Sequence, residues 1–175
     1  MKMHNQIKRL VLSAVLLALG LVLPFLTGQI PEIGSMLSPL HIPVLICGFV
    51  CGWHYGMAVG IILPIMRSLI FTMPPMMAAI PMAFEMAIYG LLTGLMYRFL
   101  PKKMPYLYVS LVVSMLAGRV VWGAARYVIA GLNNTSFTFS AFLAGAIFNA
   151  VPGIILQIVL IPILVMILDN PKLRG

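Results

Sequence analysis

Long apolar runs separated by short polar segments make up almost the whole chain. A helix that crosses the hydrocarbon core of a bilayer needs about 20 predominantly apolar residues. Six runs reach or approach that length, and the segments between them are rich in Gly, Pro, Asn or charged residues. The pattern predicts an all-α integral membrane protein, a single transmembrane domain over 1–175, with spans at about 7–26, 39–54, 57–72, 77–99, 105–131 and 140–168.

The composition supports a membrane protein over a soluble one. Hydrophobic residues make up 62% of the 175 residues, charged residues only 8%, and the mean hydropathy is +1.11. Soluble domains carry about 25% charged residues. The net charge of +8 is a property shared with nucleic-acid-binding proteins. Because the basic residues mostly flank the apolar runs, we attribute the charge to membrane topology and expect no nucleic-acid partner.

The distribution of basic residues orients the predicted helices. If the N-terminus is cytoplasmic, the outer segments 27–38, 72–76 and 132–139 contain no Lys or Arg. The positive-inside rule then predicts six spans with both termini in the cytoplasm. Eight basic residues fall on the inner side: Lys2, Lys8, Arg9, Arg98, Lys102, Lys103, Lys172 and Arg174.

Four charged residues lie inside the predicted spans, mostly in the outer half. At about 1.5 Å rise per residue, Arg67 and Arg126 lie roughly 8 Å below the outer ends of their helices. Glu85 lies roughly 12 Å deep and Arg119 roughly 18 Å. The amide residue Asn149 lies roughly 13 Å down the last span.

Such groups are costly in lipid, at about 2.5 to 3.5 kcal/mol each. Glu85 can neutralise one arginine, so three arginines and one glutamate leave a charge of +2. One interpretation is a structural Glu–Arg pair that locks two helices together. The other is a pocket, open to the outside, that binds a small ligand with an acidic group. Arginine suits such a pocket because its planar guanidinium can donate two hydrogen bonds to one carboxylate.

Other polar and aromatic residues share the faces of these charges. Trp122 lies on the same stripe of its helix as Arg119 and Arg126, and Tyr89 is one turn after Glu85. They are candidate substrate-binding residues, although Trp and Tyr also serve as packing or interface residues in membranes. His41 begins the second span, where a boundary role and a ligand role both remain open.

Two pairs of residues four apart have possible packing roles. Ala14 and Ala18 would let another helix approach the first span closely. The alternative is internal packing, because glycines repeat this spacing elsewhere. Cys47 and Cys51 have no His or carboxylate neighbours in sequence, so we expect packing and no metal site.

Size, span number and several local runs give the chain a resemblance to a known family. The runs are SPLHIPVLICGFVCGWHYG, PIMRSLIFTMPP and MAFEMAIYGLLTGLMY, together with Ala14-x-x-x-Ala18. The chain resembles the substrate-binding S-component of an energy-coupling factor (ECF) transporter, in particular the vitamin-transporter branch.

The resemblance implies a function and a set of partners. S-components capture a vitamin or its precursor at the outer face of the bacterial plasma membrane. They associate with a transmembrane coupling subunit and two cytoplasmic ATPase subunits, and in the proposed cycle they topple within the bilayer. By this resemblance Ala14 and Ala18 would contact the coupling subunit, and the loop at 27–38 would close over the ligand. The later helices would build the pocket, with Arg67 fitting less well and serving instead as a support.

The surplus positive charge favours a vitamin that carries a carboxylate. We expect pantothenate first, with nicotinate, biotin, folate, pyridoxine and hydroxymethylpyrimidine as alternatives. No G-x-x-x-x-G-K-[ST] motif is present, so we expect no enzyme, no cofactor and ATP hydrolysis in partner subunits. The rival interpretation is a stand-alone secondary transporter or channel for a small organic anion.

Overall fold

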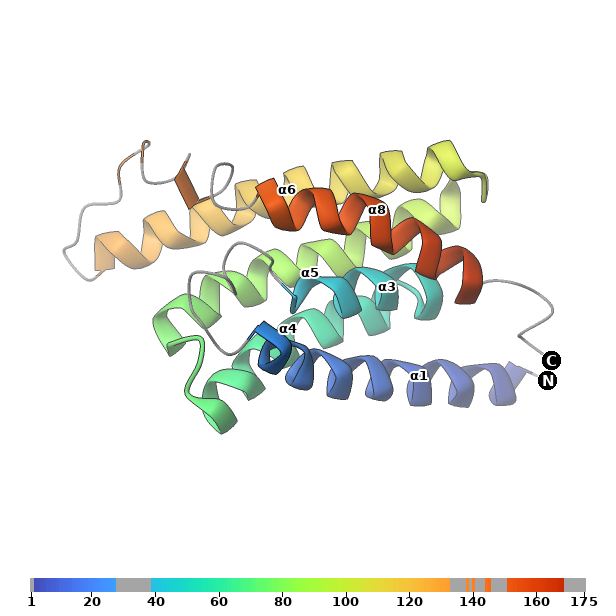
Figure 1. The fold of residues 1–175 in the computed structure, drawn as a ribbon, viewed down its shortest axis with the longest axis horizontal. Coiled ribbons are helices and arrows are strands. Elements are labelled where there is room, and N and C mark those ends of the chain that lie inside the picture. Colours follow the sequence, from blue (N-terminus) through green and yellow to red (C-terminus); the bar gives the residue numbers. More distant parts are fainter. Residues whose placement is uncertain are drawn as a thin grey trace.

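The computed structural model describes residues 2–27, 39–132, 138, 140, 144–145 and 151–168. Within these residues the chain is all-helical and contains no strand, and five of its helices are long and apolar enough to cross a membrane. The elements are α1 (Lys2–Val22), the 3-10 turn η1 (Leu23–Thr27), α3 (His41–Cys51), α4 (Trp53–Phe71), α5 (Met76–Phe99), α6 (Met104–Leu132) and α8 (Val151–Leu168) (Figure 1).

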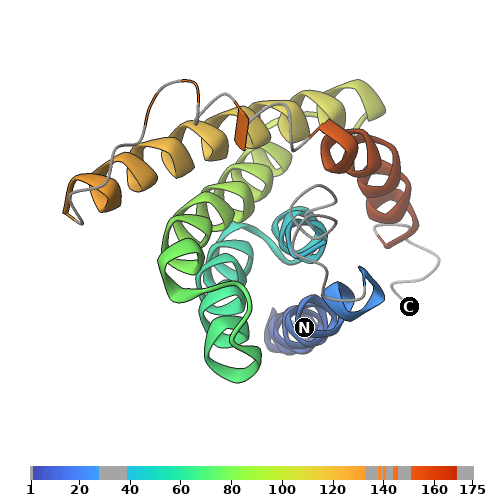
Figure 2. The same ribbon diagram turned by 60° about the vertical axis from the view of Figure 1, so that its left-hand side comes forward.

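The short helix α3 occupies the centre of the bundle. All of its residues from His41 to Cys51 are buried, which is expected for a helix that is apolar on every side. In Figure 2 it lies between α1, α4, α5 and α8. Its 11 residues extend about 16 Å, roughly half the thickness of the hydrocarbon core. The first turn of α3 therefore begins inside the predicted membrane, beside the longer α5.

Glycines allow α3, α4 and α5 to pack backbone against backbone. A Cβ atom added at Gly56 would lie 2.7 Å from the Cα of Gly48 and 2.7 Å from the carbonyl oxygen of Gly90. Added side chains at Gly60 and Gly94 would also collide with neighbouring backbone. Small residues at helix interfaces favour association in membranes because they permit close contact. The glycine spacing seen in the sequence thus serves packing within this chain.

Helix boundaries differ from the predicted spans mainly between α3 and α4. The predicted spans 39–54 and 57–72 left the connection at residues 55–56, whereas the structure ends α3 at Cys51 and begins α4 at Trp53. Gly52 makes the turn alone with φ of +102°, a conformation that residues with a side chain rarely adopt. A second residue with positive φ follows α4, where Thr72 adopts φ of +58°.

The basic flanking residues gather at one end of the bundle. The start of α1, the α5–α6 turn with Lys102 and Lys103, and the end of α8 all lie at the right-hand end in Figure 1. The α4–α5 turn and the end of α6 lie at the opposite end. This clustering agrees with the distribution of basic residues from which the orientation was predicted. That the basic end faces the cytoplasm stays a prediction.

Candidate functional site

Glu85 is the centre of a buried polar cluster formed by three helices. Its carboxylate accepts a hydrogen bond of 2.6 Å from the Tyr89 hydroxyl. The Nε atom of Arg119 lies 3.2 Å from the same oxygen, Oε1, and His41 Nε2 lies 3.7 Å from Oε2. Glu85 and Tyr89 are each 1% exposed and His41 is 3% exposed. The structure thus brings together four of the residues predicted from the sequence.

The helices place these side chains through local sequence and close packing. Glu85 and Tyr89 are one turn apart on α5 and therefore share a face. Gly118 on α6 packs directly on this face, since a Cβ added there would lie 3.1 Å from the carbonyl oxygen of Glu85. The next residue is Arg119, so the glycine brings the guanidinium within reach of the carboxylate. His41 joins from the first turn of α3, and its ring packs edge-on against Tyr89 at 5.3 Å.

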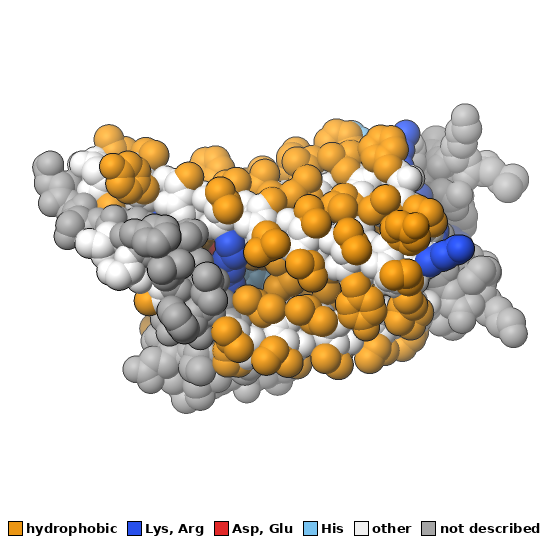
Figure 3. All heavy atoms as spheres, turned by 90° about the horizontal axis from the view of Figure 1, so that it is seen from above, with side chains coloured by type: hydrophobic (Ala, Val, Ile, Leu, Met, Phe, Trp, Pro, Cys, Tyr) orange, Lys and Arg blue, Asp and Glu red, His pale blue; other side chains and the backbone are white. Residues whose placement is uncertain are grey.

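The cluster leaves part of Arg119 available for a second partner. Its Nε atom faces Glu85, whereas its terminal Nη atoms donate no hydrogen bond to the described part of the chain. An arginine can hold two acceptors because it has five N–H donors on one plane. In Figure 3 a basic side chain is visible between apolar side chains, beside the residues not described. The arrangement can therefore hold Glu85 and one further anionic group on the same guanidinium.

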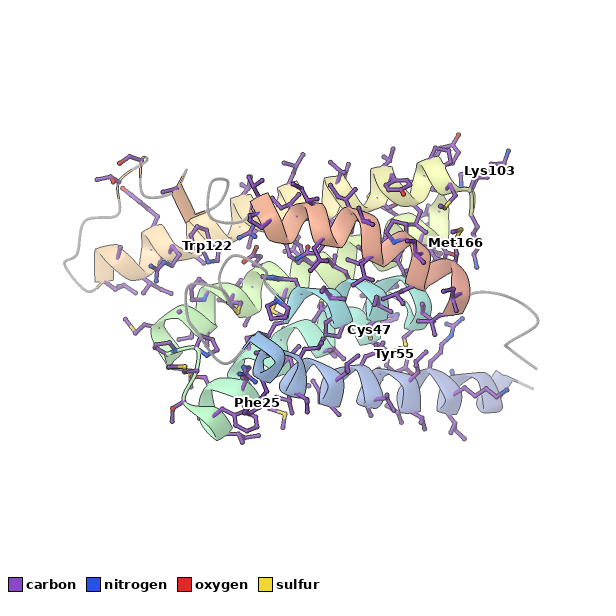
Figure 4. The ribbon with its side chains drawn as sticks, in the orientation of Figure 1. Phe25, Cys47, Tyr55, Lys103, Trp122 and Met166 are labelled. Carbon is purple, nitrogen blue, oxygen red and sulfur yellow. The ribbon has the colours of Figure 1, made fainter. Side chains whose placement is uncertain are left out.

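Trp122 and Arg126 extend the α6 stripe toward the C-terminal end of the helix. The Arg126 guanidinium lies 5.9 Å from the Trp122 ring centre, a cation–π contact. Figure 4 shows Trp122 on the side of α6 that faces the rest of the bundle. A Cβ at Gly145 would lie 2.8 Å from the Trp122 ring, so this ring packs on the segment before α8. Asn149, which was predicted to join this site, lies outside the described residues.

Arg67 is buried in a different set of contacts. It is 2% exposed and its Nη1 donates a hydrogen bond to the carbonyl oxygen of Leu21, at the end of α1. The rings of Phe25 and Phe71 lie 5.2 and 5.3 Å from its guanidinium carbon. These contacts join α1 and η1 to α4. Its predicted role in substrate binding is not tested by them, and they match the alternative role of a support.

Ala14 and Ala18 lie on the outer face of α1. Both are exposed, as are Val11, Val15 and Val22 on the same stripe, whereas Leu16 packs into the core. The stripe is apolar and free of bulky polar groups. It can face either lipid or another transmembrane helix.

One buried polar residue was missed by the sequence analysis. Gln157 on α8 is 2% exposed, and its Oε1 has no hydrogen-bond partner among the described residues. Other buried polar residues are satisfied within their own helices: Thr93, Ser110 and Ser114 donate to the carbonyl four residues earlier. The signal was present in the sequence, because Gln157 is the single polar side chain in α8.

The described residues contain no group of three His, Cys, Asp or Glu side chains that could hold a metal ion. Cys47 and Cys51 are buried in the apolar core around α3. This position agrees with the packing role that we expected for the two cysteines.

Comparison with known families identifies the class of this protein. Residues 8–165 match the family model described as the substrate-specific component of ECF transporters. The chain therefore belongs to this family, which confirms the resemblance seen in the sequence. Comparisons with curated proteins and with solved structures give no significant match.

Family membership defines what kind of subunit the chain is. Members are substrate-binding transport subunits of the membrane and not enzymes, and they work with ECF coupling and ATPase subunits. The all-helical fold with five membrane-length apolar helices agrees with this assignment.

Proposed function

We propose that this subunit captures a small water-soluble vitamin or vitamin precursor that carries an acidic group. The observation that carries the proposal is the surplus of arginine over acid in the membrane-spanning helices. Glu85 is the one acid within the described helices, and it already pairs with Arg119. Arg67 and Arg126 add two positive charges, so an anionic ligand would lower the electrostatic cost of the site.

The proposed binding residues are those that approach the cluster from α3, α5 and α6. Arg119 and Arg126 would bind the acidic group, and Trp122 would pack on the apolar part of the ligand. His41, Glu85 and Tyr89 would hold Arg119 in place and supply further hydrogen bonds. Asn149 stays in the proposed set from its position in the sequence, and Arg67 is proposed as a support for α1.

Pantothenate is the proposed ligand, because it combines a carboxylate with a compact shape. Nicotinate, biotin and folate share the acidic group but differ in size and in hydrogen-bonding groups. Pyridoxine and hydroxymethylpyrimidine carry no carboxylate and would not offset the surplus positive charge. The bacterial plasma membrane is the proposed location.

A thermal-shift panel on the purified protein tests the proposal. Pantothenate, nicotinate, biotin, folate, pyridoxine and hydroxymethylpyrimidine would be added one at a time. Tight binding adds about 4 kcal/mol of apparent stability at a thousandfold excess over the dissociation constant. A large shift with a carboxylate vitamin would support the proposal. Shifts confined to pyridoxine or the pyrimidine would overturn the acidic ligand.

We also propose that the exposed stripe with Ala14 and Ala18 contacts the coupling subunit. Ala14→Trp would add a bulky ring to this face and should abolish ATP-driven uptake while the isolated subunit still binds its vitamin. Val120→Trp is a matched control, because Val120 is 66% exposed on α6, away from the stripe. Uptake that survives Ala14→Trp would show that α1 is not the contact face.

A further inference from the structure

Gln157 carries an unexplained buried acceptor. The side chain is 2% exposed, and no residue in the described part of the chain forms a hydrogen bond with its Oε1. A buried polar group without a partner lowers the stability of a fold, so such groups are rare unless function retains them. The buried hydroxyls of Ser110, Ser114 and Thr93 differ, because each is satisfied by a carbonyl of its own helix.

The position of Gln157 along the bundle is close to that of the Glu85 cluster. α8 packs against α3 and α6, the helices that carry His41 and Arg119. The basic ends of these three helices lie together in Figure 1. Counted from those ends, His41 is about 15 Å along its helix, Gln157 about 16 Å and Arg119 about 22 Å. By this count Gln157 lies at about the level of His41, whose ring contacts Glu85.

We propose that Gln157 is a ligand-binding residue whose Oε1 accepts a hydrogen bond from a hydroxyl or amide N–H group of the substrate. The inference rests on the proposed function, because it assumes that Arg119 binds an acidic group of the same molecule. The substrate is thus a small acid that also carries a hydrogen-bond donor. Pantothenate has both groups, whereas nicotinate has the acid but no such donor.

The Gln157→Met variant tests the inference through two opposite effects. Methionine has a similar length and no polar atom, so it removes the unpartnered acceptor without leaving a large cavity. The melting temperature without vitamin should rise, because a buried unsatisfied group is lost. The affinity for pantothenate should fall at least tenfold, because the hydrogen bond to the ligand is lost as well.

Two control variants separate ligand binding from packing. Ser114→Ala removes a buried hydroxyl that is already bonded within α6, and it should neither raise the melting temperature nor change pantothenate affinity. Gln157→Asn keeps the amide but shortens it by one methylene, so it should weaken pantothenate binding even if the methionine variant fails to fold.

The outcomes distinguish this inference from the proposed function. If the wild-type protein binds pantothenate and Gln157→Met binds it equally well, Gln157 has no ligand role and the proposed function stands. A melting temperature that falls in Gln157→Met would show that the amide has a structural partner and would also overturn the inference. If the wild-type protein binds none of the carboxylate vitamins, the proposed function fails and this inference fails with it.

Discussion

Arg67 and Arg119 are both arginines in membrane-spanning helices, yet their surroundings differ. Arg67 has a carbonyl oxygen and two aromatic rings around its guanidinium, and none of its described contacts is with an acid. Arg119 faces the carboxylate of Glu85, which also receives the Tyr89 hydroxyl. The first cation joins two helices, whereas the second belongs to a cluster with hydrogen-bonding capacity left over.

The different surroundings of these two arginines show that the depth of a charge in the membrane does not by itself define a ligand site. Both arginines avoid lipid, as the cost of an intramembrane charge requires. What separates them is the kind of partner that each has. Neutral acceptors and ring faces can satisfy an arginine fully within the fold, while a cluster of charged groups can rearrange around an incoming anion.

The largest expected effect comes from removing the carboxylate between the helices. Glu85→Gln would leave the partly buried Arg119 without its counter-charge, and breaking a buried pair in this way costs about 3–5 kcal/mol, an upper bound for a side chain that is 15% exposed. We expect a clear drop in melting temperature and in yield of folded protein. Unfolding curves of the purified subunit in detergent would measure it.

The double variant Glu85→Gln/Arg119→Gln is the control for this prediction. It removes both charges, so it should recover much of the stability that the single variant loses. If the single variant is as stable as the wild type, the pair does not stabilise the α5–α6 contact, and the cluster has another role.

A smaller loss of stability is expected when Arg67 is changed. Arg67→Met would remove the hydrogen bond to Leu21 and both ring contacts, which together contribute about 2 kcal/mol. The vitamin affinity of the folded protein should stay the same, because these contacts lie between α1, η1 and α4. Arg67→Lys should retain part of the stability, since an ammonium group can also reach a carbonyl and the rings.

That experiment sharpens the comparison because the sequence predicted a ligand role for Arg67. A variant that keeps its stability but loses vitamin affinity would restore that role. The structural interpretation requires the opposite pattern, with lower stability and unchanged affinity.

The smallest effect on the fold is expected at Arg126. Arg126→Ala should leave the melting temperature nearly unchanged, because the side chain is only partly buried near the outer end of α6. Vitamin affinity should fall about tenfold, equivalent to about 1.4 kcal/mol. Titration of the variant with the vitamin selected from the panel would measure this loss, and an unchanged dissociation constant would remove Arg126 from the proposed site.

Much of the fold was predictable because the membrane imposes strong rules on sequence. The positions of α1, α4, α5 and α6 follow from apolar length and turn residues. The clustering of basic residues at one end follows from their flanking positions. The central position of the short, fully buried α3 was harder to predict, because apolar composition says little about which helix lies at the centre of a bundle.

The site was predictable only in part. The contact between Glu85 and Arg119 follows from pairing the one intramembrane acid with a nearby base. The contacts of Arg67 depend on where the end of α1 packs, and sequence spacing carries no such information. Gln157 could have been found by the reasoning that selected the amide of Asn149, because it is the single polar side chain in α8.

The glycine contacts between α3, α4 and α5 have a mechanical consequence. Three helices whose backbones touch cannot slide past one another without collision, so this trio behaves as a stiff unit. A change of shape that accompanies loading would therefore alter the contacts around this trio before it alters the contacts within it.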